Sequence, residues 1–277
     1  MTAVRRSARA KRPRDGAPLV DLISLQGKRA MITGAAAGIG RAIARRFVEA
    51  GAALDLVDIE EKALVKTGRE IEGPGASVCL HPFDIATEAG RQALWEAVAE
   101  HPPDILVNNA GIYPFKGFLK VDAAFYERVL SVNLDAVYWM CQEMIGRRIR
   151  QGGVIINLAS IEAMVAFKDD LAHYSVSKAG VMALTRALAK EHGKDGFRIN
   201  ALLPGGIVTQ GTRSAALGVL RFELGLIATG LRFRQRIPLG RLGQPDEVAR
   251  MALVLASDLS AYVQGAAISV DGGFLAS

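Results

Sequence analysis

Cysteine is scarce in this sequence, which has only Cys79 and Cys141 among its 277 residues. Two cysteines without His or Cys neighbours at metal-ligand spacing supply neither a disulfide framework nor a metal centre. We expect both side chains in the interior, one on a strand and one on a helix. No metal site is therefore predicted, and the low cysteine content fits a reducing compartment such as the cytoplasm.

Long apolar runs and a strong overall charge are also missing. Half of the residues are hydrophobic, but no uncharged apolar stretch reaches the length of about 18 residues that a membrane span needs. The net charge of +6 arises mostly in residues 1–18, which contain six basic side chains and one acidic side chain, Asp15. The rest of the chain is nearly neutral. We therefore expect no membrane contact and no nucleic-acid footprint for the folded body.

The basic tail at 1–18 contains Pro13, Gly16 and Pro18. Such a composition is typical of a disordered segment, and a targeting peptide is the alternative. Residues 19–277 are enough for one large catalytic domain. They are too few for separate full-sized cofactor and substrate domains.

Short apolar segments alternate with amphipathic segments from residue 29 onward. This alternation predicts an α/β fold with a single doubly wound parallel sheet of Rossmann type and about seven strands. Residues 206–241 break the pattern and are expected to form a small lid. Strands are predicted at 29–33, 53–57, 77–80, 104–107, 153–158, 197–202 and 267–270. Helices are predicted at 39–50, 60–72, 88–100, 122–150 in one or two pieces, 174–192 and 245–256.

A glycine-rich turn, with Gly34, Gly38 and Gly40, closes the first predicted strand and opens the first helix. Such a turn exposes backbone N–H groups at a helix N-terminus, where the helix dipole favours phosphate. A side chain at the closest glycine would block a pyrophosphate. The turn therefore predicts a dinucleotide site, with a purely structural turn as the alternative.

Asp58 ends the second predicted strand, 18 residues past Gly40. A carboxylate there accepts both hydroxyls of an adenosine ribose and repels a 2′-phosphate. Ala37 and Ile59 offer no basic partner for that phosphate. We therefore predict NAD rather than NADP as the cofactor, unless Asp58 is simply a solvated strand end.

Tyr174 and Lys178 are four residues apart in a predicted helix and so share one face. A nearby ammonium group lowers the phenol pKa from about 10 towards working pH. Ser160 follows the fifth strand, at the edge of the sheet where ligands bind, and its hydroxyl can donate to a substrate oxygen. Asn133 lies in the helical region before that strand, where a kinking or capping role is the alternative. The Tyr–Lys spacing alone also fits an ordinary helix surface.

Together these segments resemble the short-chain dehydrogenase/reductase family over about residues 25–275. The order and spacing of the matching segments are specific to that family. One departure is that Ser160 and Tyr174 are 14 residues apart where 13 is usual, so we expect the extra residue to loop out within 161–173, over the substrate pocket. The matching segments are TGAAAGIG at 33–40, NNAG at 108–111, SVN at 131–133, INLAS at 156–160, YSVSK at 174–178, PGGIVT at 204–209 and VDGG at 270–273.

The resemblance implies a role for each catalytic candidate. Tyr174 matches the general acid/base, and Lys178 matches the residue that lowers its pKa and binds the nicotinamide ribose. Ser160 matches the residue that orients the substrate carbonyl, and Asn133 the residue that holds a water in a proton relay. The implied cofactor-binding residues are Gly34, Gly38, Ile39, Gly40, Asp58, Asp84, Ile85, Asn109, Ala110, Gly111, Tyr174, Lys178, Ile207 and Thr209.

The expected activity is hydride transfer between NAD(H) and a secondary alcohol or ketone, with a sugar or polyol as one candidate substrate. Reduction of a 3-oxoacyl thioester is an alternative, and a non-catalytic nucleotide sensor is an alternative of another class. The resemblance also implies a homotetramer that packs the helices near 122–150 and 174–192. The polar residues Glu162, Asp169, Asp170 and His173 fit either a hydroxylated substrate or a solvated loop. The arginines at 213, 221, 232, 234 and 236 fit either an anionic substrate or a solvated surface.

Overall fold

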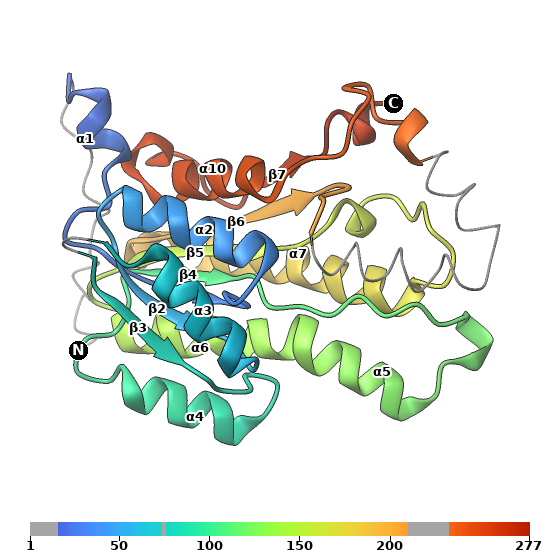
Figure 1. Ribbon diagram of the computed structural model, residues 1–277, viewed down its shortest axis with the longest axis horizontal. Coiled ribbons are helices and arrows are strands. Elements are labelled where there is room, and N and C mark those ends of the chain that lie inside the picture. The colour runs from blue at the N-terminus through green and yellow to red at the C-terminus, as the bar shows by residue number, and fades with distance from the viewer. Residues whose placement is uncertain (1–15, 74–75, 210–232) are drawn as a thin grey trace, which may run out of the picture.

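A computed structural model of the chain describes residues 16–73, 76–209 and 233–277. Most of the tail at 1–18 and most of the lid expected at 206–241 lie outside these described residues. Within them, the centre of the molecule is one seven-stranded parallel sheet in the order β3-β2-β1-β4-β5-β6-β7 (Figure 1). The strands are β1 (Arg29–Thr33), β2 (Ala53–Val57), β3 (Val78–His81), β4 (Ile105–Asn108), β5 (Gly153–Leu158), β6 (Phe197–Pro204) and β7 (Ala267–Val270).

Helices cover both faces of this sheet and confirm the predicted Rossmann-type fold (Figure 1). The α-helices are α1 (Leu19–Ile23), α2 (Gly38–Glu49), α3 (Glu61–Ile71), α4 (Glu88–Ala97), α5 (Ala123–Leu130), α6 (Ala136–Arg148), α7 (Ala172–His192) and α10 (Pro245–Ala256). The shorter pieces are η1 (Phe118–Lys120), η2 (Ser131–Asp135), η3 (Ile161–Ala163), η4 (Gly193–Asp195), η5 (Asp258–Ser260) and η6 (Phe274–Ala276).

Two apolar cores lie on opposite faces of the sheet, because successive strand residues point to opposite sides. Ile32 packs with α2, α3 and α10 on one face. Its neighbour Met31 packs with α4, α6 and α7 on the other. The central strands are buried on both faces, which explains their continuous apolar sequence. Each fully buried large side chain, such as Phe47 or Trp95, contributes about 1.5–3 kcal/mol through burial.

The region predicted as helical at 122–150 is divided into three pieces. Asp122 caps α5, since its Oδ1 atom accepts the N–H of Phe125 at 2.8 Å. One π-helical turn, η2, then links α5 to α6, and the N–H of Ala136 bonds to the carbonyl of Ser131. Such a turn inserts an extra residue and rotates the side chains that it carries. It places Asn133 fully inside the protein.

The expectation that both cysteines are buried is wrong for Cys79. Cys141 is buried on α6, but Cys79 is exposed on β3. The reason is that β3 is the edge strand of the sheet, and only its final residue, His81, is buried. The apolar neighbours of Cys79 in the sequence did not reveal this position.

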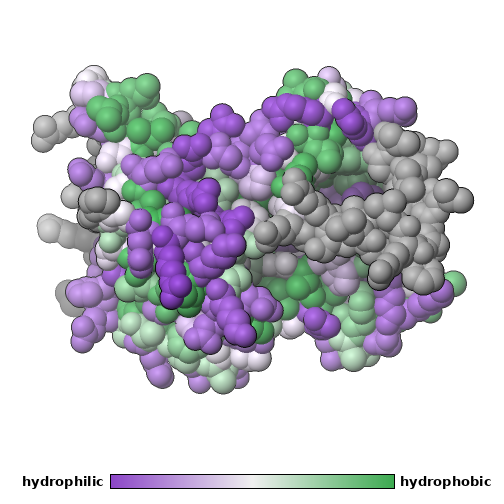
Figure 2. Space-filling model, in the orientation of Figure 1, coloured by the Kyte–Doolittle hydropathy of each residue, from purple (hydrophilic) through white to green (hydrophobic). Residues whose placement is uncertain are grey.

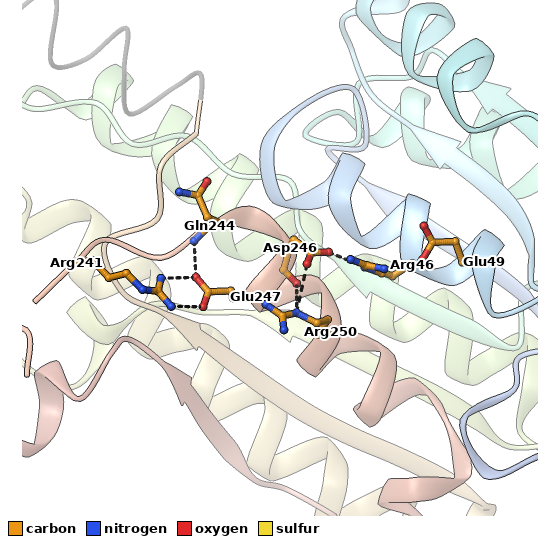
Figure 3. A network of polar contacts seen from close by, with 7 residues as sticks. All are labelled: Arg46, Glu49, Arg241, Gln244, Asp246, Glu247 and Arg250. Carbon is orange, nitrogen blue, oxygen red and sulfur yellow. Dashed lines mark hydrogen bonds and ion pairs between the residues drawn. The ribbon is translucent and has the colours of Figure 1, made fainter. Parts of the chain in front are cut away.

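A network of ion pairs fastens α10 to α2 (Figure 3). Asp246 accepts from Arg46 of α2 at 2.6 Å and pairs with Arg250 at 3.2 Å. Arg241 forms a bidentate salt bridge with Glu247, with hydrogen bonds of 2.7 and 2.8 Å. Hydrogen bonding from Arg241 lowers the pKa of Glu247 to about 2. The network orders the start of α10.

The outer face over α2 and α3 is largely hydrophilic (Figure 2). Apolar atoms are exposed at the corner formed by α1, where Leu19 and Val20 are 69% and 70% exposed. None of the helices described is long and apolar enough to cross a membrane. The described residues also hold no group of three or more His, Cys, Asp or Glu side chains arranged to bind a metal ion.

Candidate active site

The glycine-rich turn between β1 and α2 is packed closely against the end of β4. Gly34 has a φ of +66°, a region that favours glycine, and an added Cβ would lie 2.8 Å from the Cα of Ala110. A Cβ on Gly40 would overlap the carbonyl oxygen of Gly34. Asn109 donates its side-chain amide to the carbonyls of Thr33 at 2.9 Å and Gly34 at 3.0 Å. These contacts fix the turn and bring the predicted residues of β1 and β4 together.

The turn leaves the N-terminus of α2 available for an anionic group. Gly38 begins the helix, and among the described residues an added Cβ there would approach only the side chain of Thr209, at 3.4 Å. Ile39 follows within the first turn. An open helix N-terminus with a glycine at the closest approach is a ready site for a phosphate. The residues therefore fit the pyrophosphate of a dinucleotide.

Asp58 lies directly beside this turn. Its Oδ2 atom accepts the N–H of Ala36 at 2.9 Å, and its Oδ1 atom accepts the N–H of Glu60 at 3.0 Å. The carboxylate is therefore fixed at the carboxyl end of β2. Arg41, the basic residue that follows the glycine-rich turn, pairs with Glu70 at 3.7 Å.

The loop after β3 brings Asp84 and Ile85 to the same edge of the sheet. Asp84 accepts the N–H of Ala86 at 2.9 Å, and Ile85 is 8% exposed. On the other side of the edge, Ile207 follows β6 and pairs with Gly243 in an isolated bridge. The ion-pair network at the start of α10 thus adjoins the segment that carries Ile207 and Thr209.

Lys178 and Tyr174 lie on one face of α7, as predicted. The Lys178 ammonium donates to the carbonyl of Leu158, at the end of β5, with a length of 2.8 Å. It lies 5.9 Å from the centre of the Tyr174 ring. Lys178 is only 4% exposed, and burial lowers its pKa to about 8.

The surroundings of Tyr174 change the pKa of its phenol in opposite directions. Burial raises the pKa of Tyr174 to about 12, and the hydrogen bond from Ser160 acts in the opposite direction. The charge of Glu162 raises it further. Ser160 therefore lies close to the phenol, and the end of β5 meets the start of α7.

Asn133 ties the π-turn to the loop after β4. Its Oδ1 atom accepts the N–H of Ile112 at 2.8 Å, and its Nδ2 atom donates to the carbonyl of Ile112 at 2.9 Å. Nδ2 also lies 3.2 Å from the hydroxyl of Ser177. An added Cβ on Gly111 would lie 3.2 Å from Asn133 and 3.5 Å from the Lys178 ammonium. Both polar atoms of the Asn133 side chain thus have hydrogen-bond partners, and Gly111 adjoins it.

The four polar residues noted in the loop between Ser160 and Tyr174 differ in their exposure to solvent. Glu162 and His173 are each 3% exposed, whereas Asp169 and Asp170 are exposed. His173 bonds through Nε2 to the carbonyl of Pro114 at 2.8 Å. Asp170 has a φ of 63°, the single positive value for a non-glycine residue in the described chain. This distortion lies in the segment where the additional residue was expected to loop out.

Two residues beside Tyr174 were missed by the sequence analysis. Tyr113 packs its ring edge-on against the Tyr174 ring, with centres 4.6 Å apart. Lys168 donates to the Tyr113 hydroxyl at 3.2 Å. Neither residue belongs to a motif, and their approach depends on two loops that are distant in the sequence. The departure in loop length pointed to the loop that carries Lys168.

Comparison with known proteins identifies the family. A family model described as enoyl-(acyl carrier protein) reductase matches residues 34–275. The chain is 39% identical to galactitol 2-dehydrogenase (L-tagatose-forming) of Cereibacter sphaeroides, over 90% of this chain and 96% of the relative. The chain belongs to the short-chain dehydrogenase/reductase family. It is an oxidoreductase of that family.

Other relatives in the family are named for different substrates. The chain is 35% identical to a 3-oxoacyl-(acyl-carrier-protein) reductase of Chlamydia pneumoniae, over 91% of the chain and 98% of the relative. It is also 35% identical to D-threitol dehydrogenase of Mycolicibacterium smegmatis, over 90% and 94%. The curated relatives thus include enzymes named for polyols and for acyl-carrier substrates.

Solved structures confirm the fold and differ in their cofactor. A 7α-hydroxysteroid dehydrogenase complexed with NADH matches with a TM-score of 0.84 at 32% identity, over 93% of this chain and 98% of that one. A gluconate 5-dehydrogenase from Burkholderia cenocepacia in complex with NADP and tartrate matches with the same TM-score and identity, over 93% and 99%. The family therefore establishes a nicotinamide cofactor without choosing between NAD and NADP.

Proposed function

We propose that this chain oxidises a secondary alcohol group of a polyol or sugar, reversibly, with NAD as the cofactor. The observation that carries the proposal is that the buried Lys178 ammonium lies 5.9 Å from the centre of the Tyr174 ring, with Ser160 close to the same phenol. This group stands at the carboxyl edge of the sheet, next to a turn that fits a dinucleotide. NAD, when bound, accepts or supplies the hydride.

The side chains divide the proton chemistry among them. In oxidation, the Tyr174 phenolate removes the hydroxyl proton of the alcohol while Ser160 donates a hydrogen bond to the same oxygen. In reduction, Tyr174 returns the proton to the carbonyl oxygen. The Lys178 ammonium favours the phenolate through its charge, and Asn133 holds Ile112 and Ser177 in place behind the site. We propose that Asn133 also positions a water for the proton relay.

A proton carrier at Tyr174 has a direct test. We expect Tyr174→Phe to lower kcat by about 10²–10⁴-fold, because the phenyl ring cannot carry a proton. Reduced nicotinamide absorbance would be followed with NAD against polyols and simple secondary alcohols, and with NADH against 3-oxoacyl thioesters. Retention of full turnover by this variant would refute the role of Tyr174. A preference of the wild type for 3-oxoacyl thioesters would instead favour the acyl-carrier reductase alternative.

The choice of NAD rests on Asp58. Its carboxylate is fixed beside the turn, and Arg41 is already paired with Glu70. A 2′-phosphate there would meet a negative charge without a cation to balance it. We expect Asp58→Ala to raise the ratio of NADP to NAD turnover at least about tenfold, equal to about 1.4 kcal/mol. An unchanged ratio would show that another residue selects the cofactor.

We further propose a homotetramer in a cytoplasmic compartment. Tyr138 and Trp139 on α6 are 46% and 43% exposed, beside a shallow groove between α6 and α7. Small residues of α7, including Gly180 and Ala183, line that groove. Exposed aromatic side chains beside a shallow groove that small residues partly line suit helix packing against a second copy of the chain. The small number of cysteines supports the compartment.

A further inference from the structure

Glu162 is buried, and one of its two carboxyl oxygens has no hydrogen-bond partner among the described residues. It is 3% exposed, and its Oε1 atom has no hydrogen-bond partner within the described chain. Its other oxygen, Oε2, accepts from the hydroxyl of Ser175 at 3.3 Å. Its backbone N–H bonds to the Ser160 hydroxyl at 3.2 Å, so the residue is anchored to the catalytic group. A buried polar atom costs about 1–3 kcal/mol when nothing pairs with it, so Oε1 is available as an acceptor for a bound group.

The Lys168 ammonium group, on the same loop, also has few hydrogen-bond partners. Its ammonium lies 5.4–5.8 Å from the centres of four aromatic rings, those of Tyr113, Phe115, Phe167 and Phe233. Its one hydrogen bond in the described chain is to the neutral Tyr113 hydroxyl at 3.2 Å. An ammonium group has three donors. Two of these donors therefore have no acceptor among the described residues.

The two charges are close but do not form an ion pair. Their charges act on each other through space. Burial raises the pKa of Glu162 and lowers that of Lys168, while the backbone N–H groups of Phe167 and Lys168 partly offset the rise at Glu162. Both groups adjoin the catalytic centre, because the Glu162 charge acts on Tyr174 and Tyr113 and the rings of these two tyrosines are in contact. Glu162 thus supplies a hydrogen-bond acceptor next to Ser160, and Lys168 supplies donors next to the Tyr113 ring that packs on Tyr174.

A hydroxyl group is the simplest chemical group that both donates and accepts one hydrogen bond. We propose that Glu162 and Lys168 recognise a hydroxyl group next to the reacting carbon of the substrate, which donates to Glu162 Oε1 and accepts from Lys168. This inference rests on the proposed oxidation of a secondary alcohol and narrows its substrate to vicinal polyols. A site that binds a substrate hydroxyl also rejects an analogue without it, since its buried polar groups are then left unpaired.

The pair also selects against charged substrates. One carboxyl and one ammonium group together are neutral overall, whether the proton resides on Glu162 or on Lys168. An anionic substrate would gain from the ammonium group but be repelled by the carboxylate. A neutral polyol satisfies both groups, and so we infer it over a sugar acid or a phosphorylated carrier.

The test compares three four-carbon alcohols that differ only in their hydroxyl groups: threitol, 2,3-butanediol and 2-butanol. Steady-state kinetics with NAD would be measured for the wild type, Glu162→Gln and Lys168→Gln. We expect each variant to lower kcat/KM for threitol and 2,3-butanediol at least about tenfold more than for 2-butanol, mainly through KM. Gln keeps the approximate size of each side chain but removes the charge.

Asp169→Asn is the matched control, because Asp169 is an exposed carboxylate on the same loop. It should leave the ratio of polyol to 2-butanol activity at the wild-type value. Thermal unfolding and NAD titration would show whether the Gln variants are folded and bind cofactor. Equal losses on all three alcohols, or no loss, would overturn the recognition of a vicinal hydroxyl while leaving the alcohol dehydrogenase proposal intact. Failure of the wild type on every alcohol would overturn both.

Discussion

At the scale of single residues, the active site keeps charges and phenols where water is largely excluded. Lys178 is nearly inaccessible and has one carbonyl partner, Leu158. Such burial disfavours the charged form of the side chain and so lowers its pKa. In the proposed mechanism, the same desolvation would strengthen the electrostatic effect of this ammonium group on Tyr174. Catalytic strength and folding stability are therefore opposed at this position.

This opposition predicts that Lys178→Met abolishes turnover but stabilises the fold at neutral pH. The folded-state pKa of about 8 lies below the unfolded value of about 10.4, so the unfolded chain binds more protons between these pH values. The penalty for burying Lys178 is thus fully present below about pH 8 and disappears as the pH rises towards about 10.4. We expect a gain of about 1–2 kcal/mol at pH 7, after the lost hydrogen bond to Leu158 is subtracted.

Urea unfolding of the wild type and Lys178→Met, at pH 7 and at pH 10, measures this difference. The stability gap between the two proteins should narrow at pH 10. A variant that is less stable than the wild type at pH 7, or a gap independent of pH, would contradict the assigned effect of burial.

At the scale of secondary-structure elements, a side-chain cluster joins three neighbouring strands at the outer part of the sheet. Asp55 of β2 is fully buried and receives two contacts from Arg29 of β1, at 2.6 and 2.8 Å. Its Oδ1 atom also lies 2.8 Å from His81 at the end of β3. Burial would raise the pKa of Asp55, but the hydrogen bonds from His81 and Arg29 outweigh it and lower the pKa.

The cluster predicts that Asp55→Ala destabilises the protein by about 3 kcal/mol, because the substitution leaves Arg29 without its partner in a mostly buried position. Because the folded-state pKa is lowered, the contribution of Asp55 is present above about pH 4 and is lost as the pH falls through the folded-state value. Denaturant unfolding at pH 7 and pH 3 would measure both effects. A substitution that costs less than about 1 kcal/mol at pH 7 would show that the cluster contributes little.

Most elements were predicted within a few residues, because each carries its own periodicity or a stop signal. β1, β2, β5 and β7 have the predicted bounds, and α10 agrees as well. The π-turn η2 was not predicted, since it has no periodicity distinct from that of the flanking helices. The exposure of Cys79 was not predicted either, because strand order decides which strand lies at the edge. Strand order depends on contacts between segments that are distant in the sequence.

At the scale of the whole molecule, the parallel strands direct all functional loops to one edge of the sheet. The turn after β1, the loops after β4 and β5 and the segment after β6 meet there. The helices α6 and α7 support the same edge, and their outer surface carries the exposed aromatic residues Tyr138 and Trp139. The proposed assembly would therefore bury the back of the catalytic helix.

We expect Trp139→Glu to split the proposed tetramer into smaller species, because a carboxylate in an apolar interface is costly without a partner. Analytical ultracentrifugation of both proteins at the same concentration would detect the change in mass. Val20→Glu is the control, because Val20 is 70% exposed on α1 and far in sequence from α6 and α7. A wild type that sediments as a monomer would refute the tetramer, and an unchanged mass for Trp139→Glu would place the interface elsewhere.

The sequence by itself determined the fold class, the family resemblance and the candidate residues of the site. Glycines in a tight turn, a tyrosine and a lysine one helical turn apart, and strands with their own periodicity are local patterns that short segments carry on their own. Only the tertiary structure decided that the Glu162 charge acts on Tyr174, that Lys168 bonds to Tyr113 and that Tyr113 packs on the Tyr174 ring. It also decided that Asp55 joins three strands. These relations depend on desolvation and on contacts across the chain. No local pattern records them, because burial and unpaired hydrogen-bonding groups are properties of the packed molecule.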